Sequence, residues 1–220
     1  MSSLPDIINR YRHNRGFGIQ SPAAFYFVTE VLNERLPYYA YEQLAAIAKE
    51  GGEFSVAHCK LLFRMANYIK PQNIISFSAG SGSAVSAMIA GKSRAICYVV
   101  DECNALASQA KVFLAEKQSR EHYGNGLELL QGVLDEVGVV GLLHIGNTLK
   151  YDRAVESALN HVNNNSVIIV EGIHRTKELK EWWQKMVEDS RTIVTFDMYS
   201  MGVIFFDNNY KKQHYTLKMK

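Results

Sequence analysis

The stretch NIISFSAGSGSAVSAMIAGKSRAICYVVDEC, residues 73–103, decides the fold of this chain. It begins with an apolar strand over residues 74–77, followed by a turn of small residues over 78–83 and an amphipathic helix over 84–90. A second apolar strand follows over residues 95–100. A strand, a glycine turn, a helix and a second strand form the first half of a nucleotide-binding α/β unit.

The turn and the acid after the second strand indicate what this unit binds. Gly80 and Gly82 let the backbone approach a ligand closely. The helix N-terminus behind them offers free N–H groups. Asp101 follows the second strand directly, where a carboxylate can accept hydrogen bonds from ribose hydroxyls.

The spacing of the glycines narrows the class of ligand. The dinucleotide fingerprint needs a third glycine where this chain has Val85, so a pyrophosphate cofactor is disfavoured. No Gly-Lys-Ser/Thr ends the turn, which excludes a Walker phosphate-binding loop. A plain strand–helix–strand crossover with a small-residue turn and no ligand is the alternative that the motif leaves open.

The composition is that of an ordinary globular protein. The 220 residues are 47% hydrophobic and 21% charged with a net charge of +2, so one domain is expected and nucleic-acid binding is disfavoured. No apolar run reaches about eighteen residues and the N-terminus lacks a signal-peptide core, so we expect a cytoplasmic protein without membrane contact. The three cysteines form no CxxC pair, which suits a reducing compartment and gives no support for zinc.

The sequence of residues 1–70 predicts four helices before the first strand. These helices are expected to form a helical cap or appendage, and residues 71–220 are expected to form a Rossmann-like domain. Residues 1–20 are expected to be a polar arm with a short helix. Ser21 and Pro22 look like the N-cap and first residue of a helix that Pro37 ends. Ser55 is expected to cap the last helix before the first strand.

The remaining chain alternates strands and helices, which predicts a largely parallel sheet. Residues 192–198 and 203–206 are joined by too few residues for a crossover helix, so these two strands must be antiparallel. A further edge strand is expected over 213–217. The other predicted elements are helices over 105–117 and 151–161 and strands over 127–130, 139–145 and 166–170.

The glycine turn, the acid and this order of elements resemble class I S-adenosylmethionine-dependent methyltransferases of the catechol O-methyltransferase-like branch. The resemblance covers residues 70–208. It implies a Rossmann-like α/β fold with a mostly parallel seven-stranded sheet, a C-terminal antiparallel hairpin and an N-terminal helical appendage. It also implies S-adenosylmethionine as the cofactor.

Carried onto this sequence, the resemblance implies a set of cofactor-binding residues. The methionine moiety of the cofactor would be lined by the turn residues Ser78, Ala79, Gly80, Ser81 and Gly82. The ribose would be bound by Asp101 and Glu102, and the adenine would lie near Gly132, Val133 and Leu134 in the loop after the third strand. The sulfonium would lie near His144.

The chain departs from the family where metal-dependent members hold their ion. Those members carry acids at the ends of the fourth and fifth strands, where this chain has His144 and Glu171. A single carboxylate is too few for Mg²⁺ or Ca²⁺, so we predict no catalytic metal. Glu171, His174 and His144 are the candidate catalytic bases, each weighed against a purely structural role, and Asn147 could orient a substrate.

Three functions follow from these residues. The first is methyl transfer to a small-molecule acceptor at oxygen. The second is a catalytically inactive relative that binds S-adenosylmethionine, S-adenosylhomocysteine or another nucleotide as a scaffold. The third is a methyltransferase for RNA or another macromolecule, for which basic residues at both ends would contact phosphates: Arg10, Arg12, His13, Arg15, Lys211, Lys212, Lys218 and Lys220. A homodimer is compatible with the sheet edge and the aromatic N-terminal helices.

Overall fold

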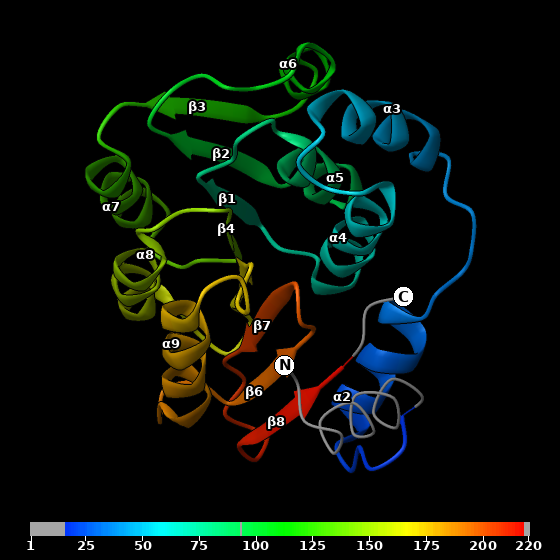
Figure 1. Cartoon of the computed structure of the whole chain (residues 1–220), viewed down its shortest axis with the longest axis vertical. Coiled ribbons are helices and arrows are strands. Elements are labelled where there is room, and N and C mark those ends of the chain that lie inside the picture. The colour runs from blue at the N-terminus through cyan, green and yellow to red at the C-terminus, as the bar shows by residue number, and fades with distance from the viewer. Residues whose placement is uncertain (1–15, 93, 218–220) are drawn as a thin grey trace.

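The computed structural model describes residues 16–92 and 94–217 and shows one eight-stranded sheet between two layers of helices (Figure 1). The strand order is β3-β2-β1-β4-β5-β7-β6-β8. The strands are β1 (Asn73–Phe77), β2 (Ile96–Asp101), β3 (Ser119–Tyr123), β4 (Leu142–Ile145), β5 (Val167–Glu171), β6 (Val194–Asp197), β7 (Met201–Phe205) and β8 (Gln213–Thr216).

The pairing of the strands confirms the expected mixture of directions. Strands β1 to β5 pair in parallel, and β7 runs antiparallel to both β5 and β6. Strand β8 pairs in parallel with β6 at the edge of the sheet. Strand β8 confirms the further edge strand expected over residues 213–217, and with it the sheet has eight strands within the described residues, one more than the seven expected from the resemblance.

Helices cover both faces of the sheet (Figure 1). One core joins the sheet to α2 (Pro22–Tyr26), the π-helix η1 (Phe27–Leu32), α3 (Tyr41–Gly51), α4 (Val56–Ile69), α5 (Ser83–Gly91) and α6 (Ser108–Ala115). A second core on the other face includes α7 (Gly126–Val137), α8 (Tyr151–Ala158), the short 3₁₀ helix η2 (Leu159–His161) and α9 (Lys177–Glu188). Within the two described ranges, every helix is too short or too polar to cross a membrane.

The predicted helix starts before β1 are confirmed. The Ser21 hydroxyl accepts the Ala24 N–H at 3.3 Å with Pro22 in the first turn of α2. The Ser55 hydroxyl accepts the His58 N–H at 3.1 Å at the start of α4. Helical structure after Ser21 ends at Leu32 in π-helical turns, ahead of Pro37. Most of the predicted polar arm, residues 1–15, lies outside the described residues.

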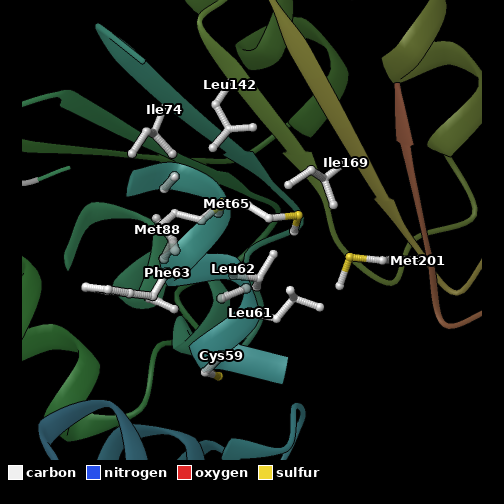
Figure 2. Packing of buried hydrophobic residues seen from close by; sticks show 14 of the residues in the cluster. Cys59, Leu61, Leu62, Phe63, Met65, Ile74, Met88, Leu142, Ile169 and Met201 are labelled. Atoms are coloured by element: carbon white, nitrogen blue, oxygen red, sulfur yellow. The ribbon is translucent and has the colours of Figure 1, made fainter. Parts of the chain in front are cut away.

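The N-terminal helices share a core with the sheet. Figure 2 shows Leu62 and Met65 of α4 beside Met88 of α5, under Ile74 of β1 and Leu142 of β4. All five side chains are fully buried. Helix α4 thus helps to form the layer that supports β1 and its turn, while the division into units 1–70 and 71–220 stays a prediction.

The predicted third strand was wrong. Residues 127–130 lie in helix α7, and the third strand is β3, Ser119–Tyr123. The reason is that β3 lies at the sheet edge, where Arg120 and Glu121 are exposed, so it lacks the apolar run typical of a buried parallel strand. Leu130, Val133 and Leu134 are buried at helical spacing instead.

Candidate functional site

The glycine turn lies at the carboxyl end of β1, beside the point where the strand order reverses between β1 and β4. Open α/β sheets bind ligands at such a switch point. Gly80 and Gly82 both have positive φ, +54° and +82°. Ser78 also has a positive φ of +57°, a conformation that favours glycine. Helix α5 begins directly after the turn.

Asp101, the last residue of β2, contacts this turn directly. Its Oδ2 accepts the Gly80 N–H at 2.9 Å, and its Oδ1 accepts the Glu102 N–H at 2.7 Å. The carboxylate is partly exposed. The structure therefore brings the glycine turn into contact with the acid that follows the second strand, about twenty residues further along the sequence. Glu102 is exposed and forms an ion pair with Lys150.

The residues predicted to lie near an adenine are placed differently. Gly132, Val133 and Leu134 belong to the middle of α7, with Val133 and Leu134 in the core, so they are not at the end of a strand. The loop after β3 is residues 124–125, and Gly126 begins α7. The Gly124 N–H donates to the Asp101 carbonyl at 3.1 Å, and a Cβ at Gly126 would lie 3.1 Å from the Phe77 ring.

Sequence reasoning missed this loop because β3 was not recognised. The available signal was the Gly124-Asn125-Gly126 run itself, since glycine and asparagine between a strand and a helix mark a βα loop. Asn125 occupies the N-cap position of α7 without a side-chain hydrogen bond to the helix, and it is exposed. These residues share the carboxyl edge of the sheet with Asp101.

A buried chain of polar side chains runs beneath the turn, from β1 through β4 and β5 to α4. Ser76 Oγ lies 3.2 Å from His144 Nδ1, and His144 Nε2 lies 3.3 Å from Glu171 Oε1. The same Glu171 oxygen lies 2.8 Å from His58 Nε2. All four residues are at most 5% exposed. His58 is a member that the sequence did not single out, because its position on α4 looked like part of an apolar face.

Two imidazoles determine the charge state of Glu171. Burial raises the pKa of its carboxyl, but hydrogen bonds and charge interactions with His144 and His58 outweigh burial and hold that pKa below its ordinary value. Glu171 is therefore a carboxylate at neutral pH. Because Glu171 and His144 are buried and hydrogen-bonded to each other, the geometry favours a supporting role for both over direct contact with a substrate.

A second histidine–carboxylate pair lies closer to the surface. His174 follows β5, and its Nε2 lies 2.7 Å from Oδ2 of Asp197 at the end of β6. The imidazole stacks on the Tyr199 ring, with centroids 5.1 Å apart and planes 9° from parallel. Tyr199 is 56% exposed. The His174 side chain itself is 12% exposed, so its imidazole is held by Asp197 and Tyr199 and keeps a limited contact with solvent.

A contact between the ends of β4 and β5 completes this edge. Arg175 Nη1 donates to Asn147 Oδ1 at 2.7 Å, and a Cβ at Gly172 would lie 3.2 Å from the same oxygen. Asn147, His174 and Arg175 thus lie at the carboxyl ends of neighbouring strands, as predicted for His174 and Asn147 from their positions in the chain.

The carboxyl edge of the sheet carries side chains of the types that bind metal ions, among them Asp101, His144 and Glu171. In residues 16–92 and 94–217 no group of three or more His, Cys, Asp or Glu side chains is arranged to hold a metal ion. His58, His144 and Glu171 are close, but their polar atoms are directed at one another. The metal-independence predicted from the sequence remains a prediction.

A large cavity elsewhere does not belong to this site. It has a volume of about 730 Å³ and lies at the amino ends of the strands, where Asn73, Gly141 and Ser166 are among its lining residues. Ligands of open α/β sheets bind at the carboxyl ends. The position of the cavity, rather than its size, therefore separates it from the candidate site.

Several solved structures with a similar fold are methyltransferases. The O-methyltransferase TomG from Streptomyces achromogenes, involved in tomaymycin synthesis and crystallised with SAM, is 15% identical with a TM-score of 0.60 over 83% of this chain and 95% of its own. The SAH-bound methyltransferase PaMTH1 from Podospora anserina is 12% identical with a TM-score of 0.63 over 87% and 98%. The Bacillus cereus O-methyltransferase in complex with SAH is 14% identical with a TM-score of 0.59 over 90% and 97%.

At these identities the likeness is one of fold. The chain has the Rossmann-like α/β fold of class I methyltransferases, with antiparallel strands at its C-terminal end. No protein-family model matches the sequence, and no curated protein matches it significantly.

Proposed function

We propose that this protein transfers the methyl group of S-adenosylmethionine to a small-molecule acceptor, at oxygen and without a catalytic metal. The observation that carries the proposal is the hydrogen bond between Gly80 and Asp101 at the switch point of a methyltransferase fold. It joins a turn that contains Gly80 to a partly exposed carboxylate, which can accept hydrogen bonds from the hydroxyls of a ribose.

The chain offers groups for each part of that cofactor. The turn from Ser78 to Gly82 would hold the amino-acid part, and Asp101 with Glu102 the ribose. Asn125 and Gly126, next to Phe77, are better placed for the adenine than the predicted residues 132–134. When bound, S-adenosylmethionine supplies an electrophilic methyl group on its sulfonium.

His174 is the residue we assign to remove the proton of the acceptor hydroxyl. Because Asp197 lies 2.7 Å from its Nε2, that nitrogen carries the hydrogen and Nδ1 is left as the proton acceptor. Stacking on Tyr199 holds the ring in place. Glu171 and His144, the other two candidate bases, would keep the ends of β4 and β5 in register.

The cofactor site is tested by titrating the purified protein with S-adenosylhomocysteine. We expect micromolar binding, and we expect Asp101→Ala to weaken it by about 1 to 3 kcal/mol, because the ribose hydroxyls and the Gly80 N–H lose their acceptor. Asp152→Ala, which removes an exposed acid from α8, is the control. If the wild-type chain does not bind S-adenosylhomocysteine at millimolar concentration, the proposed function is wrong.

The base is tested by turnover. His174→Gln should lower the release of S-adenosylhomocysteine, with a panel of small hydroxylated acceptors, by about 100-fold or more. The affinity for S-adenosylhomocysteine should not change. His161→Gln, on η2 at the other end of the sheet, should leave both unaffected. If His174→Gln turns over as fast as the wild type, His174 has a structural role and another residue acts as the base.

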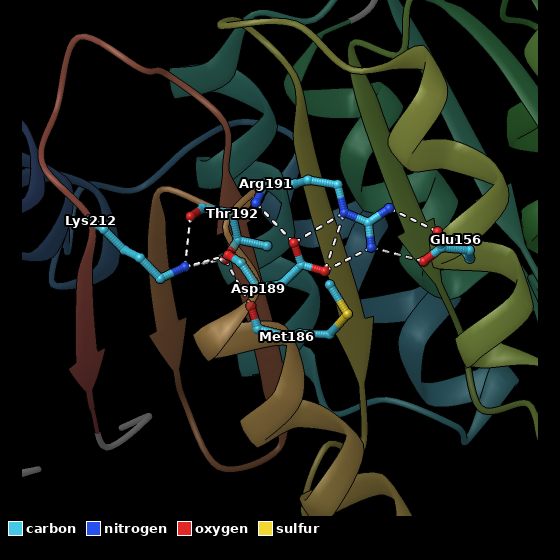
Figure 3. Close-up of polar contacts among 6 residues, drawn as sticks. All are labelled: Glu156, Met186, Asp189, Arg191, Thr192 and Lys212. Atoms are coloured by element: carbon cyan, nitrogen blue, oxygen red, sulfur yellow. Dashed lines mark hydrogen bonds and ion pairs between the residues drawn. The ribbon is translucent and has the colours of Figure 1, made fainter.

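The polymer-binding alternative receives little support from the described basic residues. Lys212 Nζ donates to the Thr192 carbonyl at 2.9 Å and to the Thr192 hydroxyl at 3.0 Å (Figure 3). In the same cluster Arg191 binds Glu156 at 2.8 Å and Asp189 at 2.7 Å. Lys212 is therefore engaged in local contacts, whereas Lys211, the other described residue of this alternative, is exposed. Arg10, Arg12, His13, Arg15, Lys218 and Lys220 lie outside the described residues.

A further inference from the structure

The segment between α3 and α4 lies against the glycine turn. The Gly51 backbone is so close to the turn that a Cβ there would overlap the hydroxyls of Ser81 and Ser83. Glu50, beside it, accepts the Ser108 N–H at 3.2 Å and the Gln109 N–H at 2.9 Å at the start of α6. The chain therefore brings one of its own carboxylates to the N-terminus of α6 on this side of the sheet.

Glu53 takes the position in front of the turn. Its Oε2 accepts the Ser81 N–H at 3.2 Å and the Ser81 hydroxyl at 3.3 Å. A Cβ added at Gly80 would overlap the Glu53 carboxylate, so the carboxylate lies directly over that glycine. In phosphate-binding turns, N–H groups at such a position are free to receive the phosphate. Here one of them already donates to a protein anion.

The charges around the turn are mostly negative. Glu53 and Asp101 both contact it, and Glu50 and Glu102 lie on either side. Lys150 pairs with Glu102, whereas the ion pairs of the described ranges give Glu50, Glu53 and Asp101 no cationic partner. A phosphate brought to the turn would meet several carboxylates that have no cationic partner among the described residues, and a cation would be attracted to them.

We infer that Glu53 is a specificity-determining residue: it attracts the positively charged α-amino group of an amino-acid-bearing nucleoside to the turn and rejects nucleotides that carry phosphate. This inference rests on the proposed function, because it assigns a role to one residue of the same cofactor site.

The experiment is isothermal titration of the full chain with three ligands. S-adenosylhomocysteine has the amino group, 5′-methylthioadenosine is the same kind of nucleoside without the amino-acid part, and ADP carries phosphate. We expect Glu53→Gln to weaken the binding of S-adenosylhomocysteine about tenfold and to change the affinity for methylthioadenosine by less than twofold. The affinity for ADP should increase. Glu53 is exposed, so the variant should fold, which a thermal melt checks.

Glu50→Gln is the matched control, because it neutralises an acid of the same segment that contacts α6 instead of the turn. It should leave S-adenosylhomocysteine binding within twofold. If the wild-type chain binds S-adenosylhomocysteine and Glu53→Gln binds it equally or more tightly, the inference alone is overturned. Tighter binding of ADP than of S-adenosylhomocysteine by the wild type also overturns it. If the wild type binds neither nucleoside, the proposed function fails, and the inference fails with it.

Discussion

At the scale of single residues, Glu171 places a carboxylate in the core of the protein, beside two imidazoles. It is 3% exposed and shares one oxygen between His58 and His144. A buried carboxylate is tolerated only when hydrogen-bonded partners compensate its charge. The same contacts hold its pKa below the ordinary value against the effect of burial.

Glu171→Gln should therefore destabilise the fold by about 2 kcal/mol at neutral pH, because it removes charge-assisted hydrogen bonds from two buried imidazoles. The pKa of Glu171 is lower in the folded than in the unfolded chain, so its stabilisation is fully present above the unfolded value of about 4.3 and is lost as pH falls through the lower folded value. Urea denaturation between pH 3 and 7 measures both effects.

The control for this substitution is Glu116→Gln, an exposed residue at the end of α6. It should change the free energy of unfolding by less than about 0.5 kcal/mol. An equally small change in Glu171→Gln would mean that the buried network contributes nothing to stability.

At the scale of elements, the contact of α9 with the antiparallel part of the sheet depends on one glycine. Gly202 of β7 pairs with Val170 and Asp197 on its two sides. A Cβ there would lie 2.5 Å from the six-membered ring of Trp183, which is fully buried. The indole thus fills the space that the missing side chain leaves.

Gly202→Ala should destabilise the protein by about 1 to 3 kcal/mol, because the added methyl group overpacks a closed core. Gly132→Ala is the opposite case, since no atom lies within 4 Å of the new Cβ in the exposed middle of α7. That substitution should stabilise the protein by about 0.5 to 1 kcal/mol. Thermal melts of the two variants should shift in opposite directions, and a shift in the same direction would contradict this account of the packing.

At the scale of the whole molecule, the two ends of the sheet differ in character. The carboxyl end carries the glycine turn, the Asp101 contact, the buried polar chain and the His174–Asp197 pair. The amino end carries the cavity of about 730 Å³. The candidate chemistry lies at the carboxyl end because each parallel strand delivers its last residue and its loop to the same edge.

The sequence by itself determined the unit around residues 73–103, the alternation that makes the sheet parallel, and the antiparallel ending. These follow from local patterns: apolar runs, glycine turns and a connection too short for a crossover helix. It also singled out Gly80, Asp101, Glu171 and His174, which strand order alone brings to one edge. The edge strand β3 was not predicted, because its polar residues lack the apolar pattern of a buried strand.

Only the tertiary structure decided which of these residues touch. His58 joins Glu171 across 113 positions, and Glu53 reaches Ser81 from a segment that precedes β1 by a whole helix. Such contacts depend on how α4 and its preceding loop pack on the sheet, which leaves no periodic signal in the residues involved. The physical reason is that hydrophobic periodicity records which face of an element is buried, whereas the partner of a polar side chain is set by three-dimensional packing.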